Sequence, residues 1–307
     1  MNIIDILIPL YLLITLGFFL KKYQFPSNEF WPGMEKMIYF ILFPILVFVA
    51  ILKAPMEISL FAKLAILTLI PAVLSGLLQY AGFLSPSMSR ATFSSMFQGA
   101  VRNNTTISLI IVAWLVPDTG LAMIAVIVLI MVPFNNVTSV LVLLHYGKEG
   151  NTQKSSTSLW KGVLKNPLII ASASGLALNA FGLKLPDPLL NTAEFLGRSA
   201  LPFGLLAVGA GLKFGSFFDN KLAIFLSSVG KLVITPAVTY GLCIMLSVEA
   251  DIAKVVIIFS AMPTAISSYI LAKQMGGDAD GMAQIITFQI IAAAFTLPVI
   301  LLITQNY

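Results

Sequence analysis

Long apolar stretches follow one another along almost the whole sequence. A membrane-spanning helix needs about 20 mostly apolar residues, and the chain, with 58% apolar and 10% charged residues, lacks the polar surface of a soluble domain. The stretches are continuous and do not alternate, which excludes a β-barrel. We therefore expect an all-α integral membrane protein with ten spans. They are placed near residues 3–20, 31–52, 60–83, 89–115, 119–145, 166–183, 189–212, 221–246, 252–275 and 281–303.

Composition and motifs argue against several enzyme classes. One cysteine, Cys243, and one histidine, His145, cannot form a disulfide framework or a metal cluster of these residue types. The GxxxxGK[ST] and HExxH patterns are absent. The segment GGDADG at 276–281 lacks the ligand spacing of a calcium loop and is interpreted as a turn. We expect no enzyme activity, no metal site and no cofactor, with coupling to sodium or protons left open.

Lysines and arginines predict the orientation in the membrane. If the N-terminus is external, the expected cytoplasmic loops hold eleven of these residues and the external loops four. Cytoplasmic loops are the more basic ones, so both termini are expected outside a bacterial inner membrane. The net charge of +5 is then explained by lysines in cytoplasmic loops, and it does not indicate a nucleic-acid partner. The N-terminus has no basic region before its apolar stretch, so we interpret that stretch as a span and not as a cleaved signal peptide.

Prolines show an internal repeat. Pro9 and Pro44 recur 158 residues later as Pro167 and Pro202, and Pro71 and Pro133 recur 165 residues later as Pro236 and Pro298. We interpret 1–145 as a first five-helix repeat, 146–165 as a cytoplasmic linker and 166–307 as a second repeat. Five spans make the second repeat inverted, an arrangement common in secondary transporters. The change of offset suggests a scaffold of helices 1, 2, 6 and 7 and a transport bundle of helices 3–5 and 8–10.

The fourth and ninth spans are expected to be broken near the middle of the membrane. In the fourth, Gly99 suits the end of one half-helix, and the polar run Arg102, Asn103, Asn104, Thr105 suits the start of another. In the ninth, Pro263 and Thr264 suit the start of a half-helix, followed by Ser267. Helix N-termini carry partial positive charge, so with Arg102 they predict a site for a carboxylate. The alternative is a proline kink with a polar seam between helices.

Other polar residues lie at membrane depth. Asn135 and Asn136 in the fifth span and Gln284 and Gln289 in the tenth either complete a substrate or cation site or only join helices. Lys231 in the eighth span is either a substrate or proton partner, or a lysine that reaches the interface or bonds a carbonyl. Glu194 and Arg198 are spaced i,i+4, which favours a structural ion pair.

The sequence contains the segments Phe97-Gln98-Gly99-Ala100-Val101-Arg102-Asn103-Asn104-Thr105, Ala261–Ala265 and Gly276-Gly277-Asp278. These segments resemble the auxin efflux carrier family. Its bacterial members are relatives of the plant PIN proteins and are often described as malate or malonate permeases. The resemblance covers the whole chain. It implies ten helices with both ends outside, a scaffold and a transport domain divided as above, and a crossing of helices 4 and 9 at Asn103 or Asn104 and Pro263. Its implied substrates are carboxylate-bearing organic anions. The long cytoplasmic loop of plant members is missing.

The function that these observations favour is secondary active transport of a small organic anion, such as malate, malonate or an auxin-like acid, by alternating access in an elevator-like motion. The expected partners are this anion and membrane lipids, and a homodimer is left open. A passive channel and a sensor built on a transporter fold are the alternatives. An intramembrane enzyme is less favoured, because the spans hold no convincing nucleophile and base.

Overall fold

The computed structural model describes residues 3–53, 58–85, 88–117, 119–147, 167–183, 185–212, 221–305 and 307. Within these ranges the chain is all helical, with no strand, as the apolar stretches predict. Five helical segments are long and apolar enough to cross a membrane, which fits an integral membrane protein. They are Phe30–Lys53, Ser59–Gly82, Gly120–Tyr146, Lys221–Met245 and Ala279–Thr304. The predicted linker 146–165 lies outside the described residues after Gly147.

Two compact units make up the chain, and each combines separate stretches of sequence. The first contains residues 1–65, 106–132 and 160–212, and the second contains residues 66–105, 133–159 and 213–307. Three of the boundaries fall inside helices, namely α4 (Ile58–Leu78), α6 (Thr105–Leu115) and α7 (Gly120–Tyr146). Each unit thus takes helices from both halves of the sequence.

The first unit is built on close helix contacts at glycines. Its helices are α1 (Ile3–Lys22), α2 (Phe30–Met37), the π-helical η1 (Ile38–Leu42), α3 (Phe43–Lys53), most of α6 (Thr105–Leu115), the start of α7, α9 (Pro167–Ala180) and α10 (Asp187–Ala210). A Cβ on Gly17 of α1 would collide with the backbone of Leu206 in α10. One on Gly175 of α9 would lie 3.0 Å from the carbonyl oxygen of Phe48 in α3. Small residues allow such approaches in membrane proteins.

These two glycine contacts follow the offset of the prolines. Gly175 is 158 residues after Gly17, and Leu206 is 158 residues after Phe48. The contact between α1 and α10 therefore has its equivalent in the contact between α9 and α3. These two contacts of the first unit therefore have the same spacing as Pro9 and Pro167.

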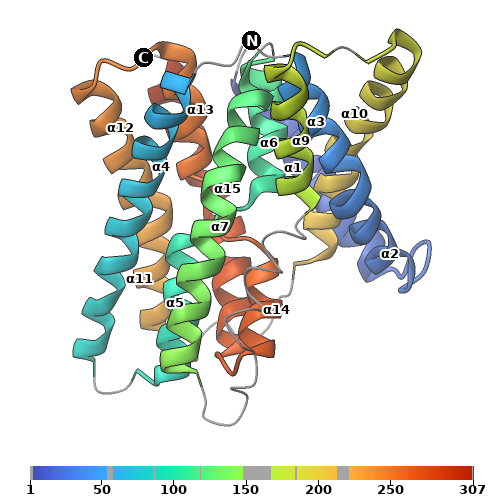
Figure 1. Ribbon diagram of the computed structural model, residues 1–307. Helices are drawn as coiled ribbons and strands as arrows, with labels where there is room; N and C mark the ends of the chain where they lie inside the picture. The colour runs from blue at the N-terminus through green and yellow to red at the C-terminus, as the bar shows by residue number, and fades with distance from the viewer. Residues whose placement is uncertain are drawn as a thin grey trace. The chain divides into compact units, whose positions relative to one another are not determined.

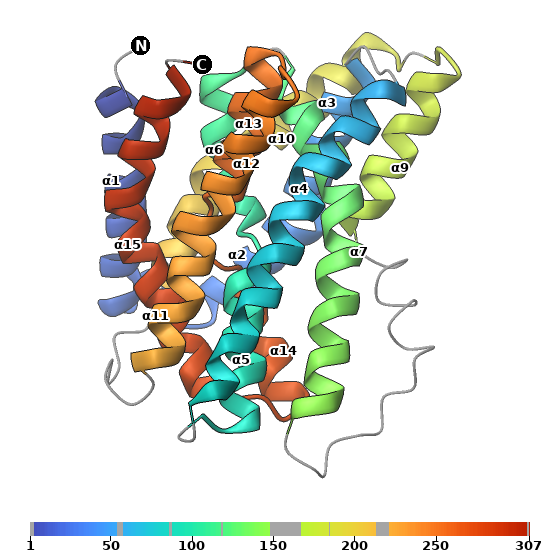
Figure 2. The same cartoon turned by 90° about the vertical axis from the view of Figure 1, so that its left-hand side faces the viewer.

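The second unit holds the residues at which the fourth and ninth spans are interrupted, 102–104 and 261–266. Its helices are most of α4, the 3₁₀-helical η2 (Gln79–Leu84), α5 (Arg90–Val101), the rest of α7, α11 (Lys221–Val229), the π-helical η3 (Gly230–Ile234), α12 (Thr235–Met245), α13 (Ala250–Ser260), α14 (Ser267–Gln274) and α15 (Ala279–Gln305). Within this unit, α5 and α14 lie at one end and α12 and α13 at the other (Figures 1 and 2).

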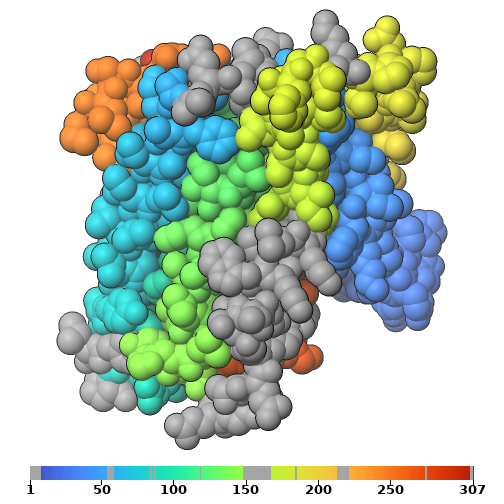
Figure 3. Space-filling model, viewed as in Figure 1, coloured from blue at the N-terminus to red at the C-terminus, as the bar shows by residue number. Residues whose placement is uncertain are grey.

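Burial distinguishes the helices of the second unit. All residues of α5 from Ala91 to Val101 are buried, although many are polar. By contrast, α4 exposes apolar side chains such as Ile70, Leu74 and Leu77, and it forms part of the face seen in Figure 3. An outward apolar helix suits lipid, and a buried polar helix suits an internal site.

Candidate functional site

The fourth span is interrupted where the sequence predicts. Helix α5 ends at Val101, Arg102 has extended backbone (φ −76°, ψ 138°), and α6 begins at Thr105. Of the predicted site residues here, Asn103 and Asn104 are buried and Arg102 is partly buried. The polar run therefore forms the break itself, and its two asparagines are buried.

The ninth span is also interrupted, but its second half starts later than predicted. Helix α13 ends at Ser260 and α14 begins at Ser267, so the prediction that the second half-helix starts at Pro263 and Thr264 is wrong. The reason is that bonds to other segments hold this backbone. The Pro263 carbonyl accepts from the Asn104 N–H at 2.8 Å, and the Thr264 N–H donates to Gln289 Oε1 at 2.9 Å.

Each break satisfies the carbonyls of the other. Helix C-termini leave carbonyls without helical partners. In α13 the Phe259 carbonyl accepts from Asn103 Nδ2 at 2.7 Å. In α5 the Gly99 carbonyl accepts from Thr264 Oγ1 at 2.5 Å and from Gln289 Nε2 at 3.0 Å. Gln289, predicted as a coupling or charge partner, thus joins α15 to both interrupted segments.

Arg102 connects three segments of the second unit. Its Nη1 donates to Asn136 Oδ1 of α7 and its Nη2 donates to Ser267 Oγ at the start of α14, each at 3.2 Å. Both of these partners are neutral side chains. The structure therefore brings together Arg102, Asn136 and Ser267 as the sequence predicts.

Several buried polar atoms without partners belong to residues close in sequence to this arrangement. Among the described residues, Asn135 Oδ1, Ser139 Oγ, Ser268 Oγ and both side-chain atoms of Gln98 are buried without a hydrogen bond. Asn135 precedes Asn136, Ser268 follows Ser267, and Gln98 lies one turn before Arg102. Buried polar groups normally have partners, so a polar ligand or water would supply the missing bonds. Gln98, Ser139 and Ser268 were not predicted, although all three lie within the polar stretches of the sequence.

Two further predicted residues lie apart from these bonds. Gln284, on α15, has a buried Oε1 without a partner in the described chain. Lys231 lies in η3 and is 1% exposed. Within the described residues no hydrogen bond or ion pair of its side chain is seen. The predicted Glu194–Arg198 pair of the first unit is present at 4.0 Å, and Glu194 also pairs with Lys53.

Contacts of the crossing again follow the repeat. Gly99 and Thr264 are 165 residues apart, as are Arg102 and Ser267. This equals the offset between Pro71 and Pro236. When equivalent residues of two repeats touch each other, they lie at the axis that relates the repeats. The two breaks of the second unit therefore meet where such an axis would pass.

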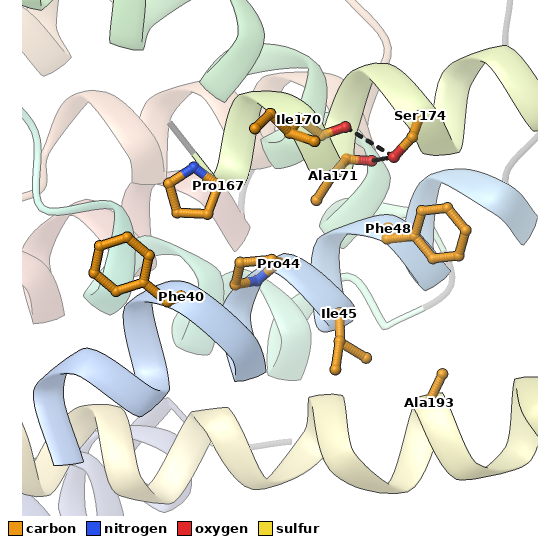
Figure 4. Close-up of a pocket in the computed structure, with 9 residues that line it drawn as sticks. All are labelled: Phe40, Pro44, Ile45, Phe48, Pro167, Ile170, Ala171, Ser174 and Ala193. Atoms are coloured by element: carbon orange, nitrogen blue, oxygen red, sulfur yellow. Dashed lines mark hydrogen bonds between the residues drawn. The ribbon is translucent and has the colours of Figure 1, made fainter. Parts of the chain in front are cut away.

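The first unit contains an apolar groove that differs from this site. Its lining is drawn in Figure 4 and comprises Phe40, Pro44, Ile45, Phe48, Pro167, Ile170, Ala171, Ser174 and Ala193. Its hydroxyl, on Ser174, already donates to backbone carbonyls of Ile170 and Ala171 at 2.8 and 3.1 Å. This lining contains no predicted site residue and offers no charged group to an anion.

Comparison with known proteins identifies the family. The family model described as membrane transport protein matches residues 2–301. An uncharacterized transporter of Methanocaldococcus jannaschii is 25% identical over 122 residues, which are 37% of this chain and 38% of that protein. The aligned part thus spans well under half of that relative. The match with the family covers nearly the whole chain, and together with the apolar helices it makes this a multi-pass membrane protein. The chain therefore belongs to the membrane transport protein family, as its resemblance to auxin efflux carriers predicts.

Proposed function

We propose that the protein is a secondary transporter of small organic anions, and that the anion binds in the second unit beside Arg102. The observation that carries this proposal is the bonding of Arg102 to Asn136 and Ser267 at two interrupted helices. The proposal places ten spans in the cytoplasmic membrane as two inverted repeats with both termini outside.

An anion fits this site better than a cation or a neutral solute. The guanidinium fork matches a carboxylate in geometry and charge. The start of α14 lies beside the guanidinium, because Ser267 Oγ accepts from Arg102 Nη2. It also adds the Ser268 hydroxyl, which is buried without a partner in the described structure. The carbonyls of Gly99 and Phe259, which would repel an anion, are both occupied by hydrogen bonds from side chains.

Alternating access is supported by the repeat. Two inverted halves can exchange conformations, which turns an outward-open protein into an inward-open one around one site. The 158-residue relation in the first unit and the 165-residue relation in the second support this reading. An elevator-like motion would carry the second unit as one body.

The first test is binding. Purified protein is screened by thermal shift against malate, malonate and other small carboxylates, with and without sodium and across pH. A ligand that binds only the folded state raises the melting temperature, by linkage. The screen is repeated with Arg102→Gln, which should lose the shift, and with Arg198→Gln, which should keep it. If no carboxylate shifts the wild-type protein, the proposal fails.

The second test separates a carrier from a channel. Proteoliposomes preloaded with unlabelled anion should accumulate labelled anion transiently above its external concentration, because a carrier exchanges one for the other. A channel would only equilibrate the label. Equilibration without such an overshoot would contradict alternating access while leaving anion binding intact.

A further inference from the structure

Asp278 joins the start of the fourth span to the turn between α14 and α15. Its Oδ2 accepts from Thr92 Oγ1 of α5 at 3.0 Å, and its Oδ1 accepts from the Gly281 N–H of α15 at 2.8 Å. Its backbone is bonded to α5 as well, because the Asp278 N–H donates to the Ala91 carbonyl at 3.3 Å and the Asp278 carbonyl accepts from Ser95 Oγ at 2.8 Å. Three of these four hydrogen bonds therefore fasten the turn to α5.

The residues before Asp278 explain why the chain turns here. Helix α14 ends with Gly276 in the left-handed region (φ 76°), and the Gly277 N–H donates to the Ala272 carbonyl at 2.8 Å. This is a Schellman motif, in which a glycine ends the helix without steric strain. Asp278 then takes the N-cap position of α15, where serine, threonine and asparagine are also preferred. Capping alone therefore does not account for the bond to Thr92.

The bonds of Asp278 and the bond of Arg102 lie at opposite ends of α14. The helix begins at Ser267, whose Oγ accepts from Arg102 Nη2 at 3.2 Å. Thr92 and Arg102 are ten residues apart, or about 15 Å along α5. Ser267 and Asp278 are eleven residues apart. Since α5 and α14 also pack against each other within the second unit (Figures 1 and 2), they run antiparallel and are bonded at both ends.

Helix α14 is too short to hold its own position. It has eight residues, or about two turns, and an isolated helix of this length is marginal. The backbone before it, at 261–266, is not helical, so α14 does not continue α13 as one rod. The bonds at its two ends therefore set where Ser267 lies along α5.

We propose that Asp278 is a positioning residue of the anion site. Its bond to Thr92 fixes α14 along α5 and so keeps Ser267 beside Arg102. This rests on the proposed function, in which the anion binds beside Arg102. Asp278 bonds α5 about 15 Å from Arg102, measured along the helix, and does not touch the anion. Its role requires an acceptor for the Gly281 N–H and a partner for the Thr92 hydroxyl, and an asparagine would provide both.

Hydrogen exchange of the protein without ligand tests whether this bond holds α14. Thr92→Val removes the hydroxyl with little change of shape. It leaves both helix caps in place, because the Ser89 cap uses the Thr92 N–H and the α15 cap uses Asp278 Oδ1. Peptides covering α14 should exchange about five-fold faster in Thr92→Val and in Asp278→Ala, which is the scale of one lost hydrogen bond. Exchange of α14 at the wild-type rate in both variants would refute the proposal, even if no carboxylate binds.

Two further variants separate the bond from the loss of a charge. Asp278→Asn keeps an oxygen for the Gly281 N–H and an amide for the Thr92 hydroxyl, so α14 should exchange at the wild-type rate. Asp280→Ala is the matched control, because Asp280 lies exposed in the first turn of α15 and its side chain has no hydrogen bond among the described residues. It should also leave the exchange of α14 unchanged. Faster exchange in both of these variants would show that the negative charge of the turn holds α14, and would overturn the role of the bond to Thr92.

Anion affinity tests whether α14 positions the site. Malonate and malate are titrated by calorimetry into the purified wild type and the variants. Asp278→Ala and Thr92→Val should bind them about five-fold more weakly, whereas Asp278→Asn and Asp280→Ala should bind them as the wild type does. Full affinity in Asp278→Ala and Thr92→Val, with faster exchange of α14, would show that Asp278 is only structural and would leave the proposed function standing. Absence of binding to the wild type would instead refute the proposed function.

Discussion

Replacing Gln289 by leucine tests whether the two interrupted segments are held together as the structure describes. The Gln289 amide donates from Nε2 to the Gly99 carbonyl at 3.0 Å, and its Oε1 accepts from the Thr264 N–H at 2.9 Å. It is fully buried on α15. Leucine has a similar volume, so Gln289→Leu removes these bonds without opening a large cavity.

The expected loss of stability follows from the polar groups that lose Gln289 as a hydrogen-bond partner. Among the described residues the Thr264 N–H has no other hydrogen-bond partner. It stays buried in the variant, and an unsatisfied buried donor costs about 1–3 kcal/mol. The Gly99 carbonyl still accepts from the Thr264 hydroxyl, so the second lost bond adds only about 0.6 kcal/mol, the average for such bonds in a membrane. We expect a total loss of stability of about 1.6–3.6 kcal/mol, which is about a 15- to 400-fold change in the folded-to-unfolded ratio.

Gln284→Leu on the same helix is the matched control. Its Oε1 is buried and has no partner within the described chain, so replacing the amide by an apolar group should be neutral or stabilising. Both variants and the wild type are compared by unfolding of purified protein in mixed micelles, followed by tryptophan fluorescence. If Gln289→Leu is as stable as Gln284→Leu, Gln289 does not hold the breaks together.

Three further substitutions test other parts of the argument. Arg102→Gln should abolish anion uptake in proteoliposomes. Arg102→Lys should restore part of the uptake, because lysine keeps the charge but lacks the guanidinium fork. Equal uptake by the wild type and both variants would show that the anion does not bind at Arg102. Asn103→Ala removes the hydrogen bond to the Phe259 carbonyl. It should lower anion uptake and reduce the stability by about 1 kcal/mol. Unchanged uptake and unchanged stability would contradict the role of Asn103 in joining the two breaks. Gly17→Leu should prevent folding, because the side chain would collide with the backbone of Leu206, whereas Gly33→Leu has open space. Recovery of folded protein after size-exclusion chromatography measures this, and equal recovery would argue against close packing of α1 and α10.

The sequence allowed the helical class, the interrupted spans and the family to be predicted, because each depends on local signals. Apolar length predicts spans, and the Gly99–Thr105 run predicts a break within two residues of the observed one. The start of α14 could not be predicted in the same way. Proline preference favours a start near Pro263, but long-range bonds from Asn104 and Gln289 hold the backbone as far as Thr264 without helix.

The site was predicted at the level of residue types but not of roles. Asn103 was expected to meet substrate, yet its amide nitrogen is bonded to Phe259. Such bonds join residues more than 150 positions apart, and nothing local to Asn103 indicates its partner. The spacing of the prolines, however, indicates which residues of the two breaks correspond to each other. The 165-residue offset pairs Gly99 with Thr264 and Arg102 with Ser267, and these pairs are bonded in the structure.

Those bonds also bear on how a carrier of this kind can move. All the residues that hold the breaks together, from Gly99 and Arg102 to Gln289, belong to the second unit. A motion that separates the two interrupted segments would break several buried hydrogen bonds at once, and each would leave a donor or acceptor in a dry environment. A motion of the second unit as one body breaks none of them. The repeat-equivalent partners are also chemically different, glycine with threonine and arginine with serine, so exchanging their roles would not rebuild the same bonds. These costs favour a site that travels intact with its unit over one that is taken apart and re-formed in each cycle.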